Sequence, residues 1–125
     1  MSALVVALAG GLGAVARFLV DAAIGRRVAR PGLPLGTLVI NVTGSLLLGL
    51  ITGWWSVAGG DPTLRLVLGT GFLGGYTTFS TASVEAARLA REGLQWRAVQ
   101  IAALMLVTCV LGAFAGFALG VLAGE

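Results

Sequence analysis

Long apolar runs alternate along this chain with short clusters of charged residues. The runs that contain no charged residue cover residues 2–16, 31–60, 66–84 and 98–124. An apolar helix of about 20 residues is long enough to cross the hydrocarbon core of a bilayer. The pattern therefore predicts an all-α membrane protein, with one domain over residues 1–125 and transmembrane helices at about 3–24, 33–57, 64–90 and 97–122.

The centre of the third run is unusual for a transmembrane helix. Gly74 and Gly75 are followed by "YTTFSTAS", which is rich in small hydroxyl side chains. Glycine costs about 1 kcal/mol relative to alanine in a helix, so the pair predicts a break near mid-membrane. The carbonyls at such a break can hold a cation, and the following helix N-terminus favours an anion. A kinked helix whose hydroxyls bond to its own backbone is the alternative interpretation.

Polar residues of the second run share one helical face. Thr37, Asn41 and Ser45 are spaced by four, and Gly44 and Gly49 leave room for a neighbouring backbone. An uncharged amide in a lipid environment needs a partner. The face is therefore interpreted either as a set of interhelical hydrogen bonds or as one wall of a polar pathway.

In the fourth run, glycine recurs at every fourth position as Gly112, Gly116 and Gly120. A ladder of small residues predicts close helix packing. Thr108 continues the ladder by one turn, and its hydroxyl is expected either to face a pathway or to bond back to the carbonyl of residue 104.

Composition excludes several functional classes. The chain is 58% hydrophobic and only 10% charged, against about 25% in a typical soluble domain. Its arginines lie at the ends of apolar runs, which indicates membrane insertion and not nucleic-acid binding. With no histidine, one cysteine (Cys109) and no paired carboxylates, we find no candidate for an enzyme active site. Arg17 and Asp21 lie one turn apart and are expected to pair.

The arginines also predict an orientation. The loop between the second and third runs contains only Arg65, whereas the first and third loops contain Arg26, Arg27, Arg30, Arg88, Arg91 and Arg97. Positive residues favour the cytoplasmic side. We therefore expect loops one and three in the cytoplasm and both termini outside the plasma (inner) membrane.

Three stretches of the chain are similar to a known family. "GGLGAVARF", "GTLVINVTGSLLLG" and "GFLGGYTTFST" resemble the small Fluc (CrcB) fluoride channels, and the similarity covers nearly the whole chain. The resemblance implies an antiparallel, dual-topology dimer of four-helix subunits. It implies a passive fluoride-selective channel that lowers cytoplasmic fluoride, with a structural sodium ion (Na+) at the dimer centre.

The resemblance also implies roles for individual residues. The sodium ligands correspond to the backbone carbonyls of Gly74 and Thr77. The other matching positions are Asn41, Phe79, Ser80 and Thr81 in the fluoride pore, Arg17 in the first helix and Glu85 near the pore mouth. Thr37 and Thr108, from the polar faces described above, complete the set of pore candidates.

Two positions depart from the family pattern. Ala82 stands where a second pore phenylalanine is usual, and Leu104 stands where a tyrosine is common. Since each pore draws residues from both subunits, a dimer of this chain alone is expected to have impaired pores. The arginine bias also favours one orientation. Both features suggest a paralogous partner subunit of opposite orientation, with an antiparallel copy of the same chain as the alternative.

Two further functions fit a chain of this length. A small multidrug exporter needs a carboxylate at mid-membrane, but Asp21 and Glu85 lie near the ends of the apolar runs. A non-conducting structural subunit of a membrane complex explains the glycine ladder. It leaves the polar face of the second run without a role.

Overall fold

The computed structural model describes residues 2–27 and 34–125, over which all regular structure is helical. Helices α1 (Ser2–Arg27), α2 (Leu35–Ala58) and α6 (Gln95–Gly124) are each long and apolar enough to cross a membrane. The expectation of an all-helical protein with membrane-length apolar helices is confirmed. Arg30, which entered the orientation argument, lies outside the described residues.

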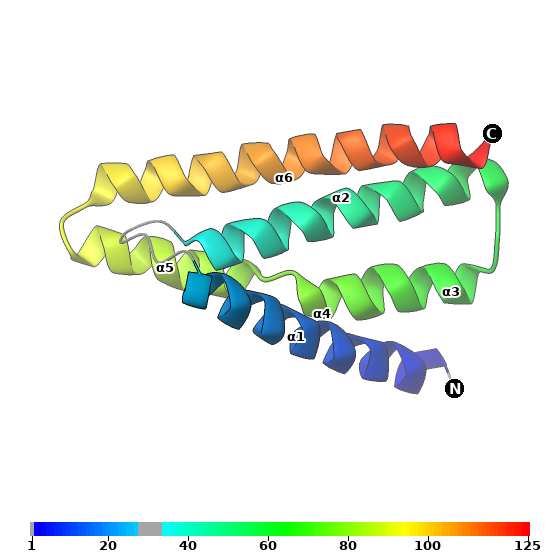
Figure 1. Cartoon of the computed structure of the whole chain (residues 1–125), viewed down its shortest axis with the longest axis horizontal. Coiled ribbons are helices and arrows are strands. Elements are labelled where there is room, and N and C mark those ends of the chain that lie inside the picture. Colours follow the sequence, from blue (N-terminus) through cyan, green and yellow to red (C-terminus); the bar gives the residue numbers. More distant parts are fainter. Residues whose placement is uncertain (1, 28–33) are drawn as a thin grey trace.

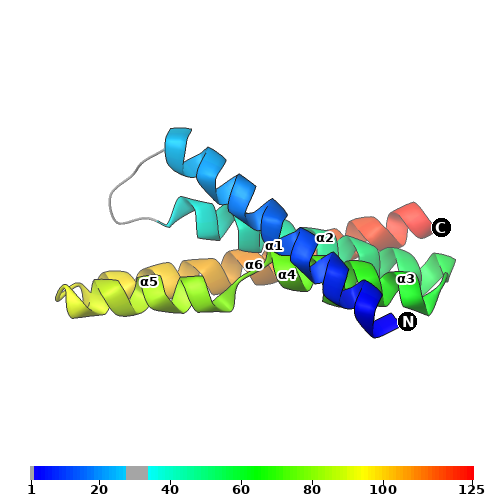
Figure 2. The same cartoon turned by 90° about the horizontal axis from the view of Figure 1, so that it is seen from below.

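The third apolar run folds into several shorter helical pieces. These are α3 (Pro62–Leu66), the π-helical segment η1 (Val67–Leu73), α4 (Gly74–Tyr76) and α5 (Phe79–Arg91). They follow one another along the molecule, and both chain ends lie opposite the turn between α5 and α6 (Figures 1 and 2). None of these pieces alone has the length of a membrane span, so a fourth crossing at 64–90 stays a prediction.

Helices α2 and α6 pack closely because glycines on each face the backbone of the other. A Cβ on Gly116 would overlap the Leu46 carbonyl oxygen, and one on Gly49 would overlap the Ala113 carbonyl oxygen. The ladder of the fourth run is therefore a packing surface, as expected. Gly44 has a different neighbour, because a Cβ there would overlap the side chain of Thr77.

The glycine pair of the third run lies within a helix, so the predicted position of the break is wrong. Gly74 has helical dihedral angles (φ −63°, ψ −36°), and α4 includes both glycines. Glycine at position 75 is explained by close packing against α1. A Cβ on Gly75 would overlap the carbonyl oxygen of Gly10, and one on Gly13 would overlap the carbonyl oxygen of Phe72.

The buried core between α2 and the pieces of the third run is small. Ile40 of α2, Leu73 of η1 and Tyr76 of α4 form its buried cluster. The Tyr76 hydroxyl lies 3.0 Å from Thr43 Oγ1, which fixes the end of α4 against α2. This contact holds the residues that follow Tyr76 beside the polar face of α2.

Candidate functional site

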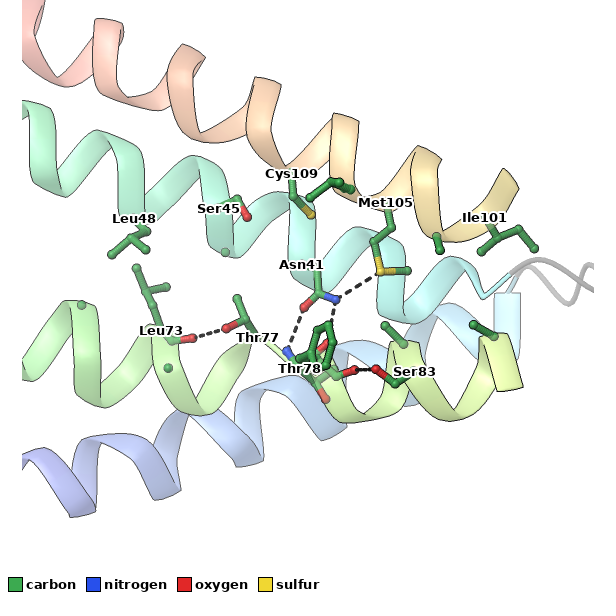
Figure 3. A pocket seen from close by; sticks show the side chains of 18 residues that line it. Asn41, Ser45, Leu48, Leu73, Thr77, Thr78, Ser83, Ile101, Met105 and Cys109 are labelled. Carbon is green, nitrogen blue, oxygen red and sulfur yellow. Dashed lines mark hydrogen bonds between the residues drawn. The ribbon is translucent and has the colours of Figure 1, made fainter. Parts of the chain in front are cut away.

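Two extended residues separate α4 from α5. Thr77 has φ −77° and ψ 159°, and Thr78 has φ −146° and ψ 119°. The backbone N–H of Thr77 donates to the Leu73 carbonyl at 2.9 Å. The Thr77 hydroxyl donates to the same carbonyl, also at 2.9 Å (Figure 3). The regular hydrogen bonding of the first half therefore ends at Leu73, and the carbonyls beyond it lie at the C-terminal end of a helix.

The Asn41 side chain holds the second of these extended residues. Its Oδ1 accepts the Thr78 N–H at 2.8 Å, and its Nδ2 donates to the Thr78 carbonyl at 2.9 Å. Nδ2 also donates to Met105 Sδ at 3.4 Å (Figure 3). Asn41 is 9% exposed and Thr78 is 7% exposed, so water does not compete for these bonds within the subunit. The Asn41 amide therefore pairs with the N–H and the carbonyl of extended Thr78, as a neighbouring strand would in a β-sheet.

Hydroxyl groups gather at the N-terminus of α5. Thr78 is the N-cap residue, and its Oγ1 accepts the Thr81 N–H at 3.2 Å. The same oxygen lies 3.2 Å from Ser80 Oγ and 3.0 Å from Thr81 Oγ1. The structure thus brings the predicted pore residues Ser80 and Thr81 together around Thr78, and both lie at exposed positions.

An open groove of about 540 Å³ runs beside this interruption, between α2, α6 and the pieces of the third run. Most of its lining is apolar or small, and its polar side chains include Asn41 and Ser45 (Figure 3). Phe79 lines the groove and is 88% exposed in the single subunit. Ala82 also lies in the lining. The predicted site residues that line this groove are Asn41, Gly74, Thr77 and Phe79.

Other predicted residues lie outside the groove lining. Thr37 Oγ1 donates to Glu85 Oε1 at 3.2 Å, which joins the beginning of α2 to α5. Thr108 donates back to the Leu104 carbonyl at 2.7 Å, as the second interpretation of that residue expects. Its hydroxyl proton is therefore used within its own helix.

The expected ion pair between Arg17 and Asp21 does not form. Among residues 2–27 and 34–125, the ion pair found is Arg88 with Glu92, at 3.7 Å on the surface of α5 and the following turn. Asp21 lies instead against the start of α2, where a Cβ on Gly36 would overlap its Oδ1. The Asp21 carboxylate therefore lies against α2 and does not pair with the arginine one turn earlier.

Residues 4–121 match the family described as "CrcB-like protein, Camphor Resistance (CrcB)". The chain belongs to the CrcB family. It is 56% identical to "Fluoride-specific ion channel FluC 2" of Cutibacterium acnes over 122 residues, which cover 96% of this chain and 98% of that protein. It is 53% identical to "Fluoride-specific ion channel FluC 1" of Leifsonia xyli subsp. xyli over 110 residues, covering 88% and 79%.

A third relative is "Fluoride-specific ion channel FluC" of Novosphingobium aromaticivorans, 45% identical over 116 residues and 91% of each chain. These names describe channels and not enzymes, in agreement with the expectation from the resemblance. Membership of the CrcB family and the apolar helices together make this a multi-pass membrane protein.

Sequence reasoning gave no specific role to three residues that shape the site of this CrcB protein: Thr78, Met105 and Tyr76. A signal existed for Thr78, because a threonine directly before a helix is a preferred N-cap. No local pattern indicates that Met105 accepts a hydrogen bond from Asn41, since the pairing depends on how α2 and α6 are aligned.

Proposed function

We propose that this protein is a passive, fluoride-selective channel through which fluoride leaves the cytoplasm. The observation that carries the proposal is the near-complete match to relatives named fluoride-specific ion channels. The groove beside the helix interruption supports it, because Asn41 and Phe79 line the same surface.

The chemistry of this groove suits a small, strongly hydrated anion. A pore must replace water by donors and yet release the ion. The Asn41 amide has one N–H directed to Met105 Sδ, which is a weak acceptor, so turning it to an anion costs little. Phe79 offers an electropositive ring edge, and α5 begins here with the positive end of its dipole. Ser80 and Thr81 add hydroxyl groups next to this helix end.

We also propose a structural sodium ion on the backbone carbonyls of Gly74 and Thr77. The donor set fits a hard cation, because carbonyl oxygens at a helix C-terminal end carry partial negative charge. Helical bonding in the first half ends at Leu73, so the following carbonyls are placed at that end. A bound sodium would supply positive potential beside the fluoride path.

The proposed assembly is an antiparallel, dual-topology dimer in the plasma membrane, with each chain crossing four times and loops one and three in the cytoplasm. The 88% exposure of Phe79 suits a side chain that completes its surroundings with a second subunit. The partner proposed is a paralogous subunit of opposite orientation, because the arginine bias favours one insertion and Ala82 leaves each pore short of one aromatic ring. An antiparallel copy of the chain is the other form of the dimer.

Fluoride efflux from liposomes tests the function. The chain reconstituted with a partner subunit of opposite loop charge is expected to empty fluoride-loaded vesicles rapidly and chloride-loaded vesicles hardly at all. The chain alone is expected to be slower, since its own dimer lacks the second phenylalanine in both pores. A fluoride electrode records both rates.

Cells that lack the chain supply an independent readout, because they are expected to stop growing in millimolar fluoride. Normal growth there, together with no efflux from either preparation, would favour the non-conducting subunit. Equal efflux with and without the partner would instead establish the homodimer.

A further inference from the structure

Two backbone N–H groups at the helix interruption donate to side chains instead of to helix carbonyls. The Thr78 N–H donates to Asn41 Oδ1 at 2.8 Å (Figure 3). The Thr81 N–H donates to Thr78 Oγ1 at 3.2 Å. In a continuous α-helix each N–H donates to the carbonyl four residues earlier. The carbonyls that lose these two donors are those of Gly74 and Thr77.

The preceding residue shows where the normal pattern stops. The Thr77 N–H still donates to the Leu73 carbonyl, at 2.9 Å. One residue later, the Thr78 N–H donates to the side chain of Asn41, which belongs to α2. The Gly74 carbonyl therefore loses its helical N–H donor because a side chain of α2 binds that donor, and not because residue 74 is a glycine.

Asn41 also prevents Thr78 from returning to a helical conformation. Its Nδ2 binds the Thr78 carbonyl at 2.9 Å while its Oδ1 binds the N–H of the same residue, so both backbone groups are fixed. Because both residues are buried, breaking this pair would leave polar groups without partners. The Thr78 hydroxyl acts in the same way on the next turn, where it holds the Thr81 N–H away from the Thr77 carbonyl.

We infer that Asn41 and Thr78 are positioning residues for the cation site, which they create by capturing the two N–H groups that would satisfy its carbonyl ligands. The inference rests on the sodium ion proposed above and adds two side chains that need not touch the ion. Both also line the groove proposed for fluoride, and the Asn41 amide links the anion path to the cation site.

Sodium-dependent thermal stability of the assembled protein in detergent tests this inference. Melting curves are recorded over a range of sodium concentrations, with N-methyl-D-glucamine replacing sodium to keep ionic strength constant. Thr78→Val keeps the shape of the side chain but removes the acceptor, so the Thr81 N–H loses its N-cap partner and the extended backbone beside the Thr77 carbonyl is held by Asn41 alone. The sodium concentration for half-maximal stabilisation is expected to rise about tenfold, as for the loss of one good ligand contact.

Three further variants make the test specific. Thr78→Ser restores the hydroxyl and is expected to respond to sodium like the wild type. Asn41→Leu removes the other acceptor and is expected to weaken the response at least as much as Thr78→Val. Ser56→Ala is the matched control, because the Ser56 hydroxyl only bonds to the Gly53 carbonyl of its own helix, at 2.6 Å. Its sodium response is expected to stay within about twofold of the wild type.

The possible failures can be told apart. A wild-type protein that melts at the same temperature in sodium and in N-methyl-D-glucamine would remove the cation site and, with it, this inference, while leaving fluoride conduction to its own assay. A sodium response in Thr78→Val equal to that of the wild type would overturn the positioning role and leave the site intact. Loss of the response in Thr78→Ser would also overturn it, since the hydroxyl is then not what matters.

Discussion

Replacing Asn41 by leucine is expected to abolish fluoride efflux and to destabilise the protein by about 2–6 kcal/mol, since each buried polar group left unpaired costs about 1–3 kcal/mol. Leucine has the same branched side-chain shape as asparagine, although it is larger, so it is the closest apolar replacement for the packing of α2. What disappears is the pair of hydrogen bonds that holds the N–H and the carbonyl of Thr78. The donor available to an anion in the groove is lost at the same time.

The loss is measured by fluoride efflux from liposomes and by denaturant unfolding in detergent. Thr52→Val provides the control, because it makes a polar-to-apolar change on the same helix outside the groove lining. This control is expected to retain both efflux and stability. Wild-type efflux in Asn41→Leu would contradict the role proposed for the amide in the anion path.

The second large effect is expected from Gly75→Ala, which should destabilise the protein by about 3 kcal/mol or more, at the upper end for overpacking. The added Cβ meets main-chain atoms of α1, with Gly10 C at 2.8 Å and Gly10 Cα at 3.0 Å. Backbone atoms in a helix cannot move aside as the end of a flexible side chain can. The two helices must separate, and the Leu73–Tyr76 end of the core opens with them.

Gly11→Ala is the matched control. Gly11 lies in α1 beside Gly10, but no atom lies within 4 Å of a Cβ added there. It is expected to stabilise α1 by up to about 1 kcal/mol, because alanine is the better helix former. Thermal unfolding in detergent compares the two variants, and opposite signs are expected. A Gly75→Ala protein as stable as Gly11→Ala would show that α1 and α4 do not approach as closely as described.

The sequence by itself determined that this is an all-helical membrane protein, and for α1, α2 and α6 it also indicated roughly where the helices lie. The reason is that length and hydropathy are local properties, and uncharged runs bounded by charged residues reveal them directly. The glycine ladder of α6 was readable for the same reason, since its members repeat at helical spacing. The motifs that resemble the CrcB family were likewise contiguous along the chain.

Only the tertiary structure decided where the third run stops being helical. The glycine pair suggested a break at residues 74 and 75, yet both glycines are helical, Gly75 allows the close approach of α1, and the extended residues are Thr77 and Thr78. The groups responsible are far apart in the chain: Asn41 reaches Thr78 across a separation of 37 residues. Competition between a side chain and a helix carbonyl for one N–H depends on which helices meet, and local sequence does not contain that information.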